Sequence, residues 1–180
     1  MLSLDEMIAK QLLHPNMDHF ADQVIDSATL HLRHDIKSLS NDFGGALVQN
    51  HLFNTAAILL LEPLAMSIFR DPMGIKARFE TKRKGVDAAL ALLALSKQQH
   101  VPVTIAIGWG KTLSFPENTW IGIEDHQARR MADFGQTNEV SMTKNMAEAN
   151  NVPEGVGVFE AKRERVLLIG YPFLIMKDYR

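Results

Sequence analysis

The chain of 180 residues is 46% hydrophobic and 22% charged, has a net charge of −2 and contains no cysteine. These values predict one domain over residues 1–180, and they exclude disulfides, thiolate zinc sites, cysteine nucleophiles and nucleic-acid binding through an overall positive field. With no signal-peptide pattern and no apolar run of about 20 residues, the chain is expected to be cytoplasmic and to lack a membrane span.

The first third of the chain, residues 1–61, is predicted to be helical. Residues 3–13 have the pattern of a short amphipathic helix. Apolar residues then recur at helical spacing from Met17 to Leu39, which predicts a long helix over 17–40. A third helix over 46–61 is apolar nearly all round and should therefore be buried.

The remainder, residues 62–180, is predicted to be an α/β core. Strands over 64–70 and 75–83 form a hairpin around a turn at Asp71–Gly74, followed by a helix over 86–97 and a core strand over 101–108. Further along, the pattern predicts a loop over 109–118, a short strand at 120–123, helices over 125–134 and 140–149, and a closing hairpin of 154–159 and 165–171. This order predicts a mixed central β-sheet flanked by helices.

A candidate metal site lies on the second strand of the hairpin. Strand alternation places Lys76, Arg78, Glu80 and Lys82 on one face, and Asp71 precedes them at the turn. Two carboxylates can bind Mg²⁺ or Mn²⁺ beside a phosphodiester, and a lysine can orient the attacking water. A regular hairpin would separate Asp71 from Glu80, so the site requires a twisted or bulged hairpin.

Further residues complete this candidate site. The third acid would be Glu62 or, less favourably, Asp42. The cations on and after the strand would contact phosphates and make binding sensitive to salt. These nucleic-acid-binding candidates are Lys76, Arg78, Arg83 and Lys84.

Asp71, the triplet Glu80-Thr81-Lys82, the helix over 86–97 and the strand over 103–107 together resemble the PD-(D/E)XK nuclease superfamily. The resemblance implies a restriction-endonuclease-like core, with Asp71 and Glu80 as metal ligands, Lys82 as the catalytic lysine and Glu62 or Asp42 as a helix-borne acid. It further implies a metal-dependent nuclease acting on DNA. A homodimer through the 17–40 helix would let such an enzyme cut both strands of a duplex.

Two alternatives to a nuclease stay open. Glu80 and Lys82 could form surface ion pairs on a non-catalytic protein, such as an immunity protein, an adaptor or an inactive nuclease-like subunit. Trp109 and Trp120 could instead line a small-molecule cleft, although two aromatic residues also commonly anchor a loop to a core.

Two smaller clusters carry other chemistry. His31, His34 and Asp35 would lie on one side of the predicted 17–40 helix, where two imidazoles and a carboxylate could bind zinc or form a polar surface. Asp125 and His126 could serve acid–base chemistry, but the sequence places no nucleophile beside them.

Overall fold

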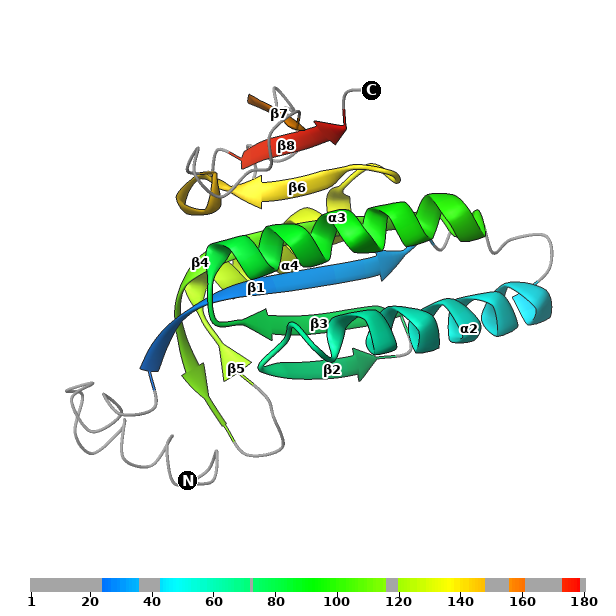
Figure 1. Cartoon of the computed structure of the whole chain (residues 1–180), viewed down its shortest axis with the longest axis horizontal. Helices are drawn as coiled ribbons and strands as arrows, with labels where there is room; N and C mark the ends of the chain where they lie inside the picture. The colour runs from blue at the N-terminus through cyan, green and yellow to red at the C-terminus, as the bar shows by residue number, and fades with distance from the viewer. Residues whose placement is uncertain are drawn as a thin grey trace.

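The computed structural model describes residues 24–35, 43–71, 73–115, 120–147, 156–160 and 173–178. Its strands form one mixed sheet in the order β2-β3-β1-β4-β6-β8-β7, with β5 paired to the end of β4 (Figure 1). The strands are β1 (Val24–His34), β2 (Ser67–Asp71), β3 (Gly74–Phe79), β4 (Val103–Ser114), β5 (Trp120–Ile121), β6 (Val140–Thr143), β7 (Val156–Glu160) and β8 (Phe173–Asp178). The helices are α2 (Phe43–Leu61), α3 (Lys82–Gln99) and α4 (Ile123–Phe134), and a 3₁₀ turn, η3, spans Lys144–Met146.

Strand β1 lies in the middle of the sheet, antiparallel to β3 on one side and to β4 on the other. The predicted helix over 17–40 is therefore wrong where the structure describes it. Residues 27–32 are all buried, because both faces of β1 are covered. Polar and apolar residues alternate in this strand, but the apolar residues from Met17 to Leu39 also recur at helical spacing, and the prediction followed that spacing. Residues 17–23 and 36–40 of that prediction, and the helix over 3–13, lie outside the described residues.

Helices α2 and α3 cover one face of the sheet, and α4 covers part of the other (Figure 1). On the first face Leu30 and Leu32 of β1 are fully buried with Phe79, Ala57 and Leu92 in one apolar core. Thr81 caps α3, since its Oγ1 accepts a hydrogen bond from the Lys84 amide at 3.2 Å. None of the helices in the described ranges combines the length and the apolar character that a bilayer span requires.

The mixed sheet and its flanking helices confirm the coarse fold prediction. The helix at 46–61, the hairpin of β2 and β3, the helix at 86–97 and the short strand at 120–121 are present with shifted ends. The predicted loop from Trp109 is wrong as far as Ser114, because β4 continues there and pairs with β1.

Of the predictions for the C-terminal part of the chain, the helix is wrong and the antiparallel strand pair is present. The helix expected over 140–149 is wrong, because residues 140–143 form β6, parallel to β4 and wholly buried, and η3 follows. A closing antiparallel pair exists as β7 and β8. Its second strand is residues 173–178, whereas the predicted 165–171 lies outside the described residues.

Replacing a buried and an exposed isoleucine by alanine should change the free energy of unfolding by different amounts. Ile107 in β4 is fully buried, and Ile123 at the start of α4 is 74% exposed. Ile107→Ala should lower the free energy of unfolding by roughly 2–5 kcal/mol through lost burial and a residual cavity. Ile123→Ala should change it by less than about 0.5 kcal/mol. Urea denaturation followed by circular dichroism measures both, and equal losses would contradict the described packing.

Candidate functional site

The second face of the sheet carries polar residues at its centre. The register places His31 of β1 beside Lys76 of β3, and Lys76 beside Phe69 of β2. Directly paired residues share a face, so these three side chains form one row on the side covered by α4. Leu30 and Leu32, one position away from His31, face the apolar core instead.

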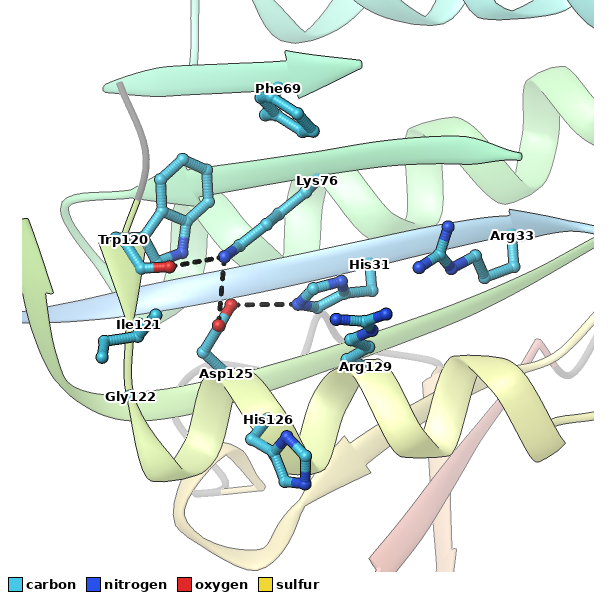
Figure 2. Close-up of a pocket in the computed structure, with 10 residues that line it drawn as sticks. All are labelled: His31, Arg33, Phe69, Lys76, Trp120, Ile121, Gly122, Asp125, His126 and Arg129. Carbon is cyan, nitrogen blue, oxygen red and sulfur yellow. Dashed lines mark hydrogen bonds and ion pairs between the residues drawn. The ribbon is translucent and has the colours of Figure 1, made fainter. Parts of the chain in front are cut away.

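A buried carboxylate from α4 joins this row (Figure 2). Asp125 Oδ1 lies 2.9 Å from His31 Nε2, and its Oδ2 accepts a hydrogen bond from Lys76 Nζ at 3.1 Å. A carboxylate can only accept, which assigns the His31 proton to Nε2. Lys76 Nζ also donates to the Trp120 carbonyl at 2.7 Å. One carboxylate therefore ties α4 to two adjacent strands, and Lys76 ties β3 to β5.

Burial and the contacts within the network together set the pKa values of its groups. It lowers the pKa of His31 below the ordinary 6.5, and the hydrogen bond with Asp125 offsets only part of that effect. Burial alone would raise the pKa of Asp125, but the hydrogen bond with His31 and the charge of Lys76 together hold it below 3.8. At neutral pH we therefore describe the network as a neutral imidazole, a carboxylate and an ammonium group.

Trp120 is covered by cations from β3. Lys76 Nζ lies 4.3 Å and Arg78 Cζ 5.2 Å from the centre of its ring, both within cation–π range. Arg78 also donates to Ser114 Oγ at 2.6 Å. Trp120 is only 1% exposed. It thus anchors the chain after β4 onto the sheet, and it also lines the pocket described below.

A pocket of about 430 Å³ opens beside the network. Its cations are Arg33, Lys76 and Arg129, and Asp125 is its one acid, so these charged side chains give the lining a net positive charge. Arg33 is paired with Asp133 at 3.3 Å, whereas Arg129 is exposed. The pocket is lined by His31, Arg33, Phe69, Lys76, Trp120, Ile121, Gly122, Asp125, His126 and Arg129 (Figure 2). Such a lining favours an anionic ligand.

The structure does not bring Asp71 and Glu80 together. Asp71 ends β2 and pairs with Gly74, whereas Glu80 follows Phe79 at the opposite end of β3. A strand of this length separates its two ends by roughly 16 Å. Glu62 follows the C-terminal end of α2, away from the hairpin turn (Figure 1). Asp42 lies outside the described residues.

The triplet Glu80-Thr81-Lys82 leaves the strand altogether. Glu80 lies in a bend and pairs with Lys84 at 2.9 Å, while Lys82 begins α3 with its Nζ 5.5 Å from the ring centre of Trp109. Arg83 pairs with Asp87 one helical turn away. The predicted basic face therefore divides between the pocket, where Lys76 lies, the buried Arg78 and the solvated start of α3.

The predicted zinc cluster is also separated. His31 faces Asp125 on one side of the sheet, whereas His34 Nε2 contacts Asn54 Oδ1 of α2 at 2.8 Å on the other side. Because β1 is a strand, histidines three residues apart point in opposite directions. No group of three or more His, Cys, Asp or Glu able to hold a metal occurs among the residues that the structure describes.

The sequence named Asp125 as an acid–base candidate but gave it no partner. Its partners are 94 and 49 residues away in the chain, so no local spacing could have found them. The available indication was the alternation of Thr29, His31 and Arg33 with Ala28, Leu30 and Leu32. This pattern predicts a strand with one polar face, and a buried polar face requires partners.

Comparison with known proteins identifies the fold. No family model matches the chain, and no curated protein matches its sequence. Solved structures do match. The catalytic core of a rhodopsin-guanylyl cyclase in complex with ATPαS superposes with a TM-score of 0.66 and 9% identity, over 87% of this chain and 99% of that one.

Two further structures agree. The adenylate/guanylate cyclase/hydrolase from Silicibacter pomeroyi has a TM-score of 0.66 and 15% identity over 85% of this chain and 95% of that one. The guanylate cyclase domain of RhGC from Catenaria anguillulae, in complex with GTP, has a TM-score of 0.65 and 9% identity over 87% and 99%. The chain therefore has the fold of adenylyl and guanylyl cyclase domains.

This fold corrects the nuclease hypothesis. The core is cyclase-like and not restriction-endonuclease-like, so the resemblance to the PD-(D/E)XK superfamily and the predictions of a hydrolase acting on DNA are wrong. The short triplet matched by chance, because its glutamate and lysine lie in a bend and a helix. The proposed dimer contact through residues 17–40 is wrong as well where it falls on β1, which is buried inside the sheet.

The network predicts how stability depends on pH. Because the pKa of His31 is lower in the folded than in the unfolded chain, its contribution is complete above about pH 6.5 and is lost as the pH falls toward the folded value. Asp125 adds a second loss below about pH 3.8. Between pH 7 and pH 5 the wild type should therefore lose stability more steeply than His31→Gln, whose amide keeps a donor for Asp125 and does not titrate. Parallel urea titrations at several pH values measure this, and identical slopes would contradict a neutral, buried His31.

Proposed function

We propose that this chain is a nucleotide cyclase domain that binds a purine nucleoside triphosphate with Mg²⁺ or Mn²⁺ and converts it to a cyclic mononucleotide. The observation that carries the proposal is the position of two aspartates in this fold. Asp71 pairs with Gly74, and Gly74 pairs with Arg33 of β1. Asp35 follows Arg33 by two residues, so both aspartates belong to the same end of adjacent strands.

The end of β1 is held beside the hairpin turn by main-chain contacts. The His34 amide donates to the Met73 carbonyl at 3.0 Å, and the Asp35 amide donates to the Pro102 carbonyl at 3.2 Å. Gly74 permits this approach, because a Cβ there would lie 1.9 Å from the Leu32 carbonyl oxygen. The backbone on both sides of the aspartate pair is thus fixed by the packing of the strands.

The N-terminal end of α2 lies toward the same end of the sheet (Figure 1). Its first turn has no acidic side chain, and Gly44 and Gly45 are exposed there. The positive end of a helix dipole favours phosphate. The aspartates and this helix end would therefore bind the metal and the phosphates of one ligand.

The carboxylates of Asp35 and Asp71 suit Mg²⁺ better than a metal ion that takes all of its ligands from protein side chains. Magnesium is held in nucleotide sites by one or two carboxylates, substrate phosphates and water, and Asp35 and Asp71 would supply two carboxylates. When bound, the ion would neutralise charge on the phosphates and make the attacking hydroxyl more acidic. Asp35 and Asp71 would position it.

The reaction requires little covalent chemistry from the protein. The ribose 3′ oxygen attacks the α-phosphorus, the bond from that phosphorus to the bridging oxygen breaks, and pyrophosphate leaves while the hydroxyl proton passes to solvent. The protein must orient these groups and stabilise negative charge. The cationic pocket adjoins the aspartates, since Arg33 and Phe69, two residues before Asp35 and Asp71, line it. It would attract the triphosphate to this face.

Nucleotide binding should depend on both aspartates. Asp35→Asn and Asp71→Asn should each weaken Mg²⁺-dependent binding of ATP or GTP by about tenfold or more, because loss of even an outer partner of a metal ligand has that effect. Glu80→Gln is the matched control and should bind as the wild type does. Isothermal titration calorimetry with and without Mg²⁺ measures the affinities, and thermal unfolding checks that each variant is folded.

Turnover is a separate measurement on the same samples. Chromatography should show one cyclic mononucleotide and one pyrophosphate formed for each triphosphate consumed, and either aspartate variant should abolish both products. Binding without cyclic product would retain the nucleotide site and reject the cyclase activity. Equal binding by wild type and both aspartate variants would reject the site itself.

A further inference from the structure

A second row of polar side chains crosses the sheet next to the row that faces the pocket. The register places Ser67 of β2 beside Arg78 of β3, and Arg78 beside Thr29 of β1. Each of the three lies two residues along its strand from a member of the first row, so its side chain leaves the sheet on the same side. We call Ser67, Arg78 and Thr29 the inner row.

The inner row contains buried polar groups that are not hydrogen-bonded. Thr29 is 1% exposed, Ser67 8% and Arg78 9%, and Trp120, whose ring lies over Arg78, is 1% exposed. Thr29 Oγ1, Ser67 Oγ, Arg78 Nε and Trp120 Nε1 have no hydrogen-bond partner among the described residues. Most buried polar groups have one, so four such groups at neighbouring positions indicate a bound ligand.

The charge of Arg78 indicates what kind of ligand this is. Arg78 Nη1 donates to the Ser114 hydroxyl at 2.6 Å, and the guanidinium lies 5.2 Å from the centre of the Trp120 ring. Within the described part of the chain no carboxylate forms an ion pair with Arg78, since the two oxygens of Asp125 are taken by other partners. A buried charge without an opposite charge is costly.

The nitrogen atoms of arginine and tryptophan side chains donate hydrogen bonds and do not accept them, so the ligand must be an acceptor. A water molecule would complete the hydrogen bonds but would leave the positive charge uncompensated. We propose that the inner row binds a small inorganic anion such as chloride, which accepts hydrogen bonds from Arg78 Nε, Trp120 Nε1 and the Thr29 hydroxyl. The ion is small because no residue of the inner row lines the pocket.

Trp120 connects this ion with the pocket. Its ring forms part of the pocket wall beside Lys76, and its carbonyl accepts a hydrogen bond from Lys76 Nζ (Figure 2). An ion bound to the indole N–H therefore fixes this wall from behind without occupying the pocket. The inference does not rest on the proposed nucleotide site, because Arg78 and Thr29 belong to neither the pocket nor the aspartate pair.

The fluorescence of Trp120 tests the anion site. The chain has two tryptophans, so Trp109→Phe leaves Trp120 as the single reporter. Iodide quenches indole fluorescence, and at an ionic strength held constant with gluconate it should quench Trp120 along a saturable curve that added chloride reverses. In this parent, Arg78→Gln should weaken iodide binding by about tenfold or more, because hydrogen bonds to charged groups are the stronger ones. Arg83→Gln is the matched control and should bind as the parent does, since Arg83 lies on the solvated start of α3.

Three results of this titration would overturn the proposal. The first is weak, linear quenching in the parent, which is what a buried indole without an ion site gives. The second is equal iodide affinity in the parent and in Arg78→Gln. The third is binding that is lost in Arg129→Gln and kept in Arg78→Gln, because Arg129 lines the pocket and the ion would then be bound there. Circular dichroism checks that each variant is folded.

Thr29→Val supplies an independent measurement that does not alter the charge. Valine has nearly the shape of threonine, and replacing an unpaired buried hydroxyl by a methyl group is neutral or stabilising. If the hydroxyl donates to a bound ion, Thr29→Val should instead lower the melting temperature relative to the wild type in chloride, and should not do so in gluconate. A variant at least as stable as the wild type in both salts would show that no ion is bound at Thr29 and would reject the site.

Discussion

The carboxylate of Asp125 is the group on which the second face of this sheet depends. A buried charge is tolerated only when it is paired and hydrogen-bonded, and Asp125 has one partner for each oxygen, His31 and Lys76. These partners come from adjacent strands in the middle of the sheet. Their shared acceptor fixes α4 at a set position over β1 and β3, and the same Lys76 holds the backbone of Trp120. The pocket lies between this helix and the strands, where Arg33 of β1, Phe69 of β2 and Arg129 of α4 line it.

The two faces of the sheet follow different physical rules. Toward α2 and α3 the contacts are apolar apart from the buried pair of His34 and Asn54, and other apolar residues of suitable volume could replace the apolar ones with modest loss. Toward α4 each polar group requires a particular partner at a particular distance, because an unpaired buried donor or acceptor is costly. Function is therefore expected on the α4 side, where side-chain identity matters most. Asp35 follows β1 and Asp71 ends β2, so the proposed metal site would adjoin the cationic pocket without sharing a residue with it.

The elements that the sequence predicted correctly are those that depend on interactions between residues close together in the chain. The helix at 46–61, the turn at Asp71–Gly74 and the helix that Thr81 caps each depend on neighbouring residues, and each is present. Strand β1 was missed because the strands that pair with it, β3 and β4, and the helices that cover its two faces, α3 and α4, lie far away in the chain. The same error separated His31 from Asp125 and grouped it with His34, since a helix places residues three apart together and a strand places them on opposite sides. The metal hypothesis named Asp71, but its expected partner Glu80 lies at the other end of β3.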